Sequence, residues 1–188
     1  MPPKARVTKD MVVKAAFEVA RKTGAENINA RTVSEKLNCS TQPVMYHFAT
    51  IEELKRAAYA KADWFHTEYL MNVEQHNILL GIGLNYIRFA VEEPHLFRFL
   101  FQSGFSTENS LLEMINSEEL KPIISTMQKT MNLNIEQTKE VFVTLALFVH
   151  GYASIIINNS LEYNEKIIAL HLERVYAGAI LAIQEQVK

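Results

Sequence analysis

The chain has 188 residues, of which 48% are hydrophobic, 21% are charged and one is a cysteine. This length suits one domain or two small ones with a real core. A single cysteine excludes a disulfide framework and a cysteine-rich zinc module. The mixed charge, with little glycine and proline, excludes disordered and collagen-like chains. The N-terminus has no apolar segment typical of a signal peptide, so we expect a cytoplasmic protein.

Charge is divided unevenly along the chain. Residues 1–66 carry 11 Lys and Arg against 7 Asp and Glu, a net charge of +4, whereas residues 67–188 carry 8 against 14, a net charge of −6. The total of −2 hides this division. A basic segment indicates contact with a polyanion, and random scatter of charges over solvated helix faces is the alternative. The motifs must decide between the two interpretations.

Apolar residues recur with helical spacing along the chain, and no stretch alternates as a strand would. Thr8 and Gly24 mark the start and stop of the first helix, and Thr50 marks the start of another. We therefore expect an all-α protein. The predicted helices span residues 8–23, 30–37, 41–47, 51–74, 78–92, 94–101, 108–115, 117–131, 134–158 and 164–186.

Residues 141–161 carry no charge, and a stretch of this length could cross a membrane. Polar His150, Ser154 and Asn158 lie inside it, and no flanking basic or tryptophan anchors follow, so we expect no membrane partner. A helix that is apolar all round is otherwise buried on several sides. This helix and the next, residues 167–183, predict a helix-bundle dimer interface, with packing inside one subunit as the alternative.

The two short helices over residues 30–37 and 41–47 are joined by a three-residue turn, which is typical of a helix-turn-helix. An ordinary helical hairpin is the alternative. The apolar positions would hold the pair against the first helix. These positions are Val33, Leu37, Cys39, Val44 and Phe48.

Such packing would leave polar side chains of the second short helix free. Ser40, Thr41 and Gln42 could then meet base edges in a major groove. Tyr46, His47 and Lys55 are positioned to reach phosphates. Cys39 is expected to pack as a small apolar residue, with redox sensing as a minor alternative.

Residues 6–66 resemble the DNA-binding domain of TetR/AcrR-type transcriptional regulators in both spacing and residue type. This match across three helices and into the fourth weighs against a simple hairpin. The matching residues are Gly24, Arg31, Val33, Ser34, Leu37, Cys39, Ser40, Val44, His47, Phe48, Thr50, Glu52, Glu53 and Leu54.

The resemblance implies a helix-turn-helix domain over residues 6–66 and a C-terminal ligand-binding and dimerisation domain over residues 67–188. It also implies a homodimeric regulator, which we expect to be a repressor that binds a palindromic operator in double-stranded DNA and is released by a small apolar effector. The residues expected to contact DNA are Arg31, Thr32, Ser40, Thr41, Gln42, Pro43, Tyr46, His47 and Lys55.

Two positions depart from the family pattern. Met45 stands where the recognition helix usually has tyrosine, and Ile51 stands where the fourth helix usually begins with lysine. Both usual residues touch phosphates in the family, so their loss would weaken binding without changing its sequence preference. Tyr46 and Lys55 could substitute. The rival hypothesis is a ligand-binding or interaction module of the same fold with weakened operator binding.

The C-terminal part resembles the family's regulatory domains more loosely, in residues 86–97 and 147–154. Aromatic and methionine side chains are abundant after residue 60, and some of them are expected to line an apolar cavity. For each of them, packing in the core is the alternative. The expected ligand-pocket residues are Trp64, Phe89, Phe101, Met127, His150 and Tyr152, with His150 as a polar anchor.

No catalytic motif is present in the sequence. Neighbouring carboxylates such as Glu92 and Glu93 point to different faces of a helix, and the histidines lack the spacing of metal ligands. We therefore expect no enzyme activity, no metal and no cofactor. A helical enzyme is the third hypothesis, and it rests on the aromatic residues alone.

Overall fold

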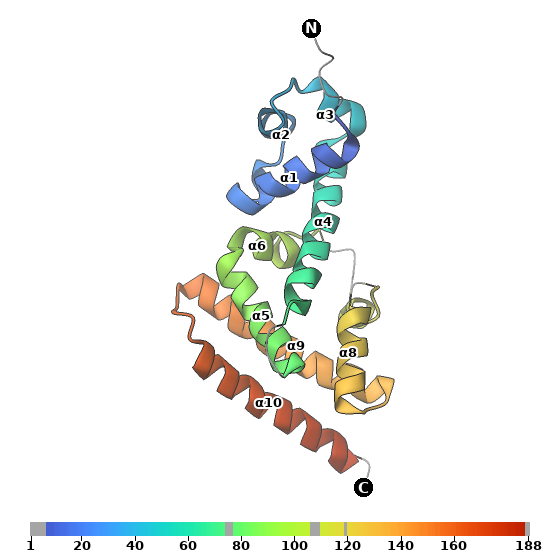
Figure 1. The fold of residues 1–188 in the computed structure, drawn as a ribbon, viewed down its shortest axis with the longest axis vertical. Coiled ribbons are helices and arrows are strands. Elements are labelled where there is room, and N and C mark those ends of the chain that lie inside the picture. The colour runs from blue at the N-terminus through green and yellow to red at the C-terminus, as the bar shows by residue number, and fades with distance from the viewer. Residues whose placement is uncertain (1–6, 74–76, 106–109, 119, 187–188) are drawn as a thin grey trace. The chain divides into compact units, whose positions relative to one another are not determined.

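A computed structural model describes residues 7–73, 77–105, 110–118 and 120–186 of the chain (Figure 1). In these residues the regular structure is helical and there is no strand, so the all-α prediction is confirmed. Glu74, Glu108 and Glu119, which belong to predicted helix ends or caps, lie outside the described residues. The predicted end at Glu74 and start at Glu108 are nevertheless wrong, because the helices end at Met71 and begin at Leu111.

The chain forms two compact units, and they are not two consecutive stretches. The first consists of Met1–Phe65 with His95–Ser106, and the second of His66–Pro94 with Thr107–Lys188. The two domains predicted from the sequence, residues 6–66 and 67–188, assign residues 95–106 to the second. In the structure this segment belongs to the compact unit that contains the N-terminal helices.

Local signals fix the helices of the first unit. The Thr8 side chain accepts a hydrogen bond from the Met11 amide, 3.3 Å, and Gly24 ends the helix at a φ of 98°, as predicted. A Cβ atom on Gly24 would also lie 2.2 Å from a carboxylate oxygen of Glu26. The helices are α1 (Lys9–Thr23), the short 3-10 helix η1 (Ala25–Asn27), α2 (Ala30–Lys36), α3 (Gln42–His47), α4 (Ile51–Met71, which continues into the second unit) and α6 (Pro94–Gln102).

The second unit contains the longest helices. They are α5 (Ile78–Glu92), α7 (Leu111–Ile115), α8 (Lys121–Met131), α9 (Ile135–Asn159) and α10 (Glu165–Gln186). The predicted start of α8 at Ser117 is wrong, because the helix begins at Lys121. Pro122 lacks an amide hydrogen and is accommodated only in the first turn of a helix, so it sets this start. Asn134 begins α9 with a reciprocal pair of hydrogen bonds to Gln137.

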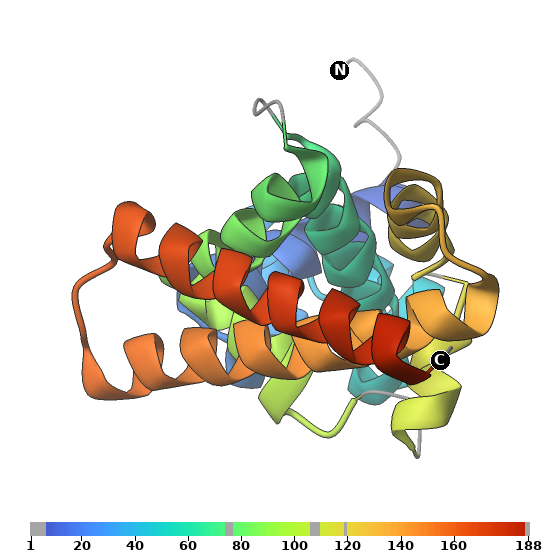
Figure 2. The ribbon, with the colours of Figure 1, turned by 90° about the horizontal axis from the view of Figure 1, so that it is seen from below.

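The core of the second unit is built from α5, α8, α9 and the ends of α4, α7 and α10. α9 and α10 run antiparallel beside each other (Figure 2). Their core side chains are aliphatic or aromatic and carry no charge. Buried members of this core are Leu70, Ile82, Ile115, Ile123, Ile124, Met127, Val141, Phe142 and Ile183.

α9 and α10 are long and apolar enough to cross a membrane by length and composition, with mean hydropathies of 1.8 and 1.4 over their most apolar stretches. The core helix of a soluble protein meets the same criterion. Only 28% and 17% of these stretches are buried inside the chain. Both helices therefore carry apolar side chains that the second unit does not cover.

Candidate nucleic-acid interface

The helix α2 is held in place by a cap at its N-terminus. The Asn29 carboxamide accepts hydrogen bonds from the Arg31 and Thr32 amides, both 3.0 Å, and the Thr32 hydroxyl oxygen accepts one from the Asn29 amide, 3.2 Å. This reciprocal arrangement satisfies amide donors that the first turn leaves open. Thr32, a predicted DNA contact, therefore has a structural role in fixing where α2 begins.

The turn between α2 and α3 occupies residues 37–41. Asn38 has a φ of 50°, a left-handed conformation that asparagine tolerates better than most residues. The Cys39 amide donates to the Ser34 carbonyl, 3.0 Å, and so ties the turn back to α2. Cys39 is half-buried against this turn. These contacts fix the direction in which α3 leaves α2.

Beneath the two helices lies an apolar core. Val33 and Val44 are fully buried and Phe48 is almost so, whereas Leu37 is half-buried. A hydrogen bond also joins α3 to the segment before α1, because His47 Nε2 donates to the Val7 carbonyl, 2.9 Å. That ring nitrogen is occupied within the chain. The packing expected of a helix-turn-helix is present in the structure.

The end of the turn and the first residue of α3 present polar side chains to solvent. Ser40, Thr41 and Gln42 are exposed, and Tyr46 is 76% exposed. Five of the predicted DNA contacts border one hollow surface beside α1. That surface is lined by Val7, Met11, Leu37, Asn38, Cys39, Ser40, Gln42, Pro43, Tyr46 and His47.

The other predicted contacts do not line this surface, and they differ in exposure. The Arg31 guanidinium forms an ion pair with Glu35, with 2.9 Å between Nε and Oε1, and is highly exposed. Lys55 is half-buried on α4. Of the two positions that depart from the family pattern, Met45 is exposed and Ile51 is half-buried. Contact of these residues with DNA stays a prediction.

The six residues predicted to line a ligand pocket are divided between the two units. Trp64 and Phe101 belong to the first unit and are exposed, Trp64 by 60%. In the second unit, Phe89 and Met127 are buried. His150 and Tyr152 are half-buried on α9. A role for any of them in ligand binding stays a prediction.

A chain of ring contacts leads from His150 through Tyr86 to the buried His66, and the sequence prediction included only His150 of these three. The Tyr86 hydroxyl donates to His150 Nδ1, 2.9 Å, and the ring of His66 packs edge-on against Tyr86 and Phe89. Burial lowers the pKa of His66 to about 3 and lowers the pKa of His150, whereas it raises the pKa of Tyr86. These three side chains are therefore neutral at pH 7. Their spacing in the sequence does not predict that they lie close together.

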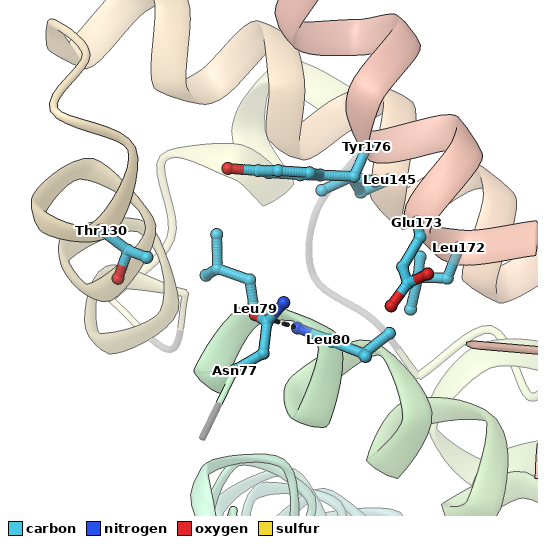
Figure 3. Close-up of a pocket in the computed structure, with 8 residues that line it drawn as sticks. All are labelled: Asn77, Leu79, Leu80, Thr130, Leu145, Leu172, Glu173 and Tyr176. Carbon is cyan, nitrogen blue, oxygen red and sulfur yellow. Dashed lines mark hydrogen bonds between the residues drawn. The ribbon is translucent and has the colours of Figure 1, made fainter. Parts of the chain in front are cut away.

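A pocket of about 200 Å³ opens in the second unit between α5, α8, α9 and α10 (Figure 3). None of the six predicted ligand residues lines it. Its walls are mainly leucine, with a carboxylate and a phenol from α10. The lining residues are Asn77, Leu79, Leu80, Thr130, Leu145, Leu172, Glu173 and Tyr176.

The described residues contain no group of three His, Cys, Asp or Glu side chains that could hold a metal ion.

No family model and no curated protein matches the chain. Solved structures do match it. A TetR-family member from Streptomyces coelicolor A3 is 16% identical, with 88% of this chain and 96% of that chain covered and a TM-score of 0.57.

Two further solved structures give the same result. The multidrug-binding protein EbrR in complex with ethidium is 14% identical, with 88% of this chain and 96% of that chain covered and a TM-score of 0.56. RolR without ligand is 18% identical, with 91% and 94% covered and a TM-score of 0.55. The structure is thus an all-helical protein with an N-terminal helix-turn-helix. Its fold is that of the TetR family, as the sequence motif indicated.

Proposed function

We propose that this protein is a cytoplasmic DNA-binding transcriptional regulator, a repressor that binds a palindromic operator as a homodimer and is released by a small effector. The observation that carries the proposal is the exposed polar start of α3 above a buried helix-turn-helix core. Ser40 and Thr41, just before α3, and Gln42, its first residue, are exposed, while Val44 of α3 is fully buried. Such a helix can enter a major groove without disturbing its own packing.

Charge supports the same assignment. The segment with the helix-turn-helix, residues 1–66, carries the net charge of +4, and residues 67–188 carry −6. A basic surface neutralises phosphates and releases counterions, which supplies most of the sequence-independent affinity for DNA. The acidic remainder is repelled by the same phosphates. DNA should therefore approach only the end of the chain that bears α3.

Homodimerisation is supported by α9 and α10. Large apolar side chains on these helices are about half exposed, among them Leu147, Ile155, Leu170 and Leu181. Several large apolar side chains left exposed on neighbouring helices are typical of an interface. A second copy of the chain suits it better than a bilayer, because Glu173 and Arg174 lie in the middle of α10 and charges there are costly inside a membrane.

The proposal is tested by selecting bound fragments from the source genome and measuring affinity for a palindromic site against shuffled DNA at several salt concentrations. We expect at least a 100-fold preference for the palindrome and a steep decrease in affinity with salt. Gln42→Ala should change the preferred sequence. Lys55→Gln should weaken binding to all sequences and lower the salt slope by about 1.

A matched control is Arg98→Gln, which removes one exposed positive charge of α6, outside the helix-turn-helix. Its salt slope should equal that of the unmodified protein. The rival function, a ligand-binding or interaction module, is favoured by the exposed Met45 in place of the family's tyrosine. A salt slope near zero, or equal affinity for palindromic and shuffled DNA, would favour the rival and refute the regulator.

A further inference from the structure

The pocket in the second unit has an acidic and an aromatic side chain on the same helix. Glu173 and Tyr176 are three residues apart on α10, so they share one face of it. Figure 3 shows Glu173 pointing toward Leu80 at the start of α5, and Tyr176 extending across the space toward the side of Thr130. The Tyr176 ring lies above Leu79, so one face of the ring borders the space between the helices.

The only charged side chain that lines this pocket is negative. No Lys, Arg or His is among its lining residues, and the only ionisable groups are the Glu173 carboxylate and the Tyr176 phenol. Within the described part of the chain, no ion pair involves Glu173. The side chain is exposed. A carboxylate at the mouth of an apolar space favours a cation over a neutral or anionic ligand of the same shape.

The walls determine which kind of cation fits. Leu79, Leu80, Leu145 and Leu172 provide apolar surface, which a metal ion or an inorganic cation cannot use. The tyrosine face attracts an alkylammonium group through its ring quadrupole. A volume of about 200 Å³ is below the roughly 300–1,000 Å³ of sites for drug-sized molecules, so the ligand must be small.

One wall of the pocket is held by a close helix contact. Gly83 of α5 faces Leu172 of α10, and a Cβ atom on Gly83 would lie 2.4 Å from Leu172 Cδ2. The absence of a side chain therefore lets α5 and α10 approach each other beside the pocket. Leu172 is itself buried, so this wall is in place before a ligand arrives. A preformed wall reduces the entropy lost on binding.

We propose that this pocket binds a small organic cation with an apolar or aromatic body, with Glu173 as its counter-ion and Tyr176 as its cation–π partner. The role of this ligand as the effector rests on the proposed regulatory function, whereas the binding itself does not. The sequence predicts a small apolar effector with His150 as its polar anchor. The position of Glu173 changes that ligand class to an amphipathic cation.

The test is isothermal titration of the full-length protein with benzyltrimethylammonium, compared with the neutral near-isostere 2-methyl-1-phenylpropan-2-ol. We expect saturable binding of the cation and at least tenfold weaker binding of the alcohol. Glu173→Gln should weaken binding of the cation at least tenfold and leave binding of the alcohol unchanged. Glu185→Gln removes another exposed carboxylate of α10 and should change neither affinity.

Tyr176 is tested by two substitutions. Tyr176→Phe should keep the affinity for the cation, because the aromatic face remains, and Tyr176→Leu should lower it about fivefold. Thermal unfolding of each variant checks that the fold is retained. Absence of saturable binding, equal affinity for cation and alcohol, or an unchanged affinity in Glu173→Gln would each overturn the proposal.

Binding of operator DNA is measured in parallel, with and without the cation. DNA binding without any binding of the cation would refute the pocket and leave the regulator standing. Cation binding with the expected Glu173 dependence, but with no specific DNA binding, would support the pocket and refute the regulator. Release of DNA by the cation in the unmodified protein, but not in Glu173→Gln, would support both.

Discussion

The helix-turn-helix and the α9–α10 pair distribute their apolar residues in different ways. In the helix-turn-helix, Val33, Val44 and Phe48 are buried and the exposed positions are mostly polar. In α9 and α10, buried Val141 and Ile183 coexist with Leu147 and Leu181, both 59% exposed. The first region completes its core within one chain. In the second region, the core leaves many apolar side chains of α9 and α10 exposed.

This difference shows that similar helical periodicity can serve two purposes. A narrow apolar stripe on a short helix is fully buried against neighbouring helices of the same chain. A helix that is apolar on several sides must be covered by something else as well, because large exposed apolar patches are rare on monomers. The first pattern indicates a self-contained unit that leaves polar groups free, and the second indicates an interface.

The largest loss of stability is expected from a substitution in the core of the helix-turn-helix. Phe48→Ala should destabilise the fold by about 3–5 kcal/mol, because it leaves a cavity where a buried ring was. Tyr46→Ala, two residues earlier but highly exposed, should change stability by less than about 0.5 kcal/mol. Urea unfolding measures both. A similar loss in the two variants would contradict the division into buried and free positions.

The apolar surface of α9 and α10 can be tested by adding charge. Leu147→Glu and Ile155→Glu should each raise the dissociation constant of the dimer about 100-fold, or about 2.7 kcal/mol, because a carboxylate would be buried without a partner. Val91→Glu, at an exposed apolar position of α5, is the control and should leave dimerisation unchanged. Sedimentation measures the association. A monomeric unmodified protein would remove the basis of this prediction.

Acid should weaken the second unit through His66. Because burial lowers its pKa from 6.5 to about 3, the unfolded chain takes up a proton near pH 6.5 that the folded chain does not accept until about pH 3. The contribution of His66 to the free energy of unfolding is therefore fully present above about pH 7. Below pH 6.5 the free energy of unfolding falls by about 1.4 kcal/mol per pH unit. In His66→Leu the slope measured by urea unfolding at pH 7, 6 and 5 should be smaller by that amount. Identical slopes would mean that the folded protein protonates His66.

The smallest expected effects come from two glycines in the second unit. Gly178→Ala should stabilise the monomer by about 1 kcal/mol, because alanine favours the helix and no atom lies within 4 Å of the added carbon. Gly83→Ala should destabilise it by about 1 kcal/mol, because the new carbon meets Leu172. Thermal unfolding at low protein concentration compares them. Destabilisation by Gly178→Ala that grows with protein concentration would indicate that a second chain approaches α10 there.

Much of the fold could be predicted where the deciding interactions are local. Thr8, Gly24 and Asn134 set the ends of helices through hydrogen bonds or conformations that involve only a few neighbouring residues. The start of α8 was missed, because the acidic residues after Ser117 suggested a cap and the constraint from Pro122 prevailed. Where two local signals disagree, as the acidic cap and the proline do here, the stricter steric constraint of proline decides.

The candidate sites divide in the same way. The helix-turn-helix was predictable because its function depends on residues that are close together in the sequence. The pocket was not, because Leu79, Leu145 and Tyr176 come from three helices far apart in the chain. The predicted ligand residues were chosen by side-chain type, and the structure distributes them over both units.

The sequence alone determined the helical class, the turn between α2 and α3 and the division of charge at about residue 66, because each depends on spacing or on simple addition along the chain. Tertiary structure decided which apolar residues are buried, which rings surround His66 and His150, and that Glu173 lies at an apolar pocket. It also joined His95–Ser106 to the first unit. These features depend on which helices meet, and packing between distant segments leaves no periodic pattern in the sequence.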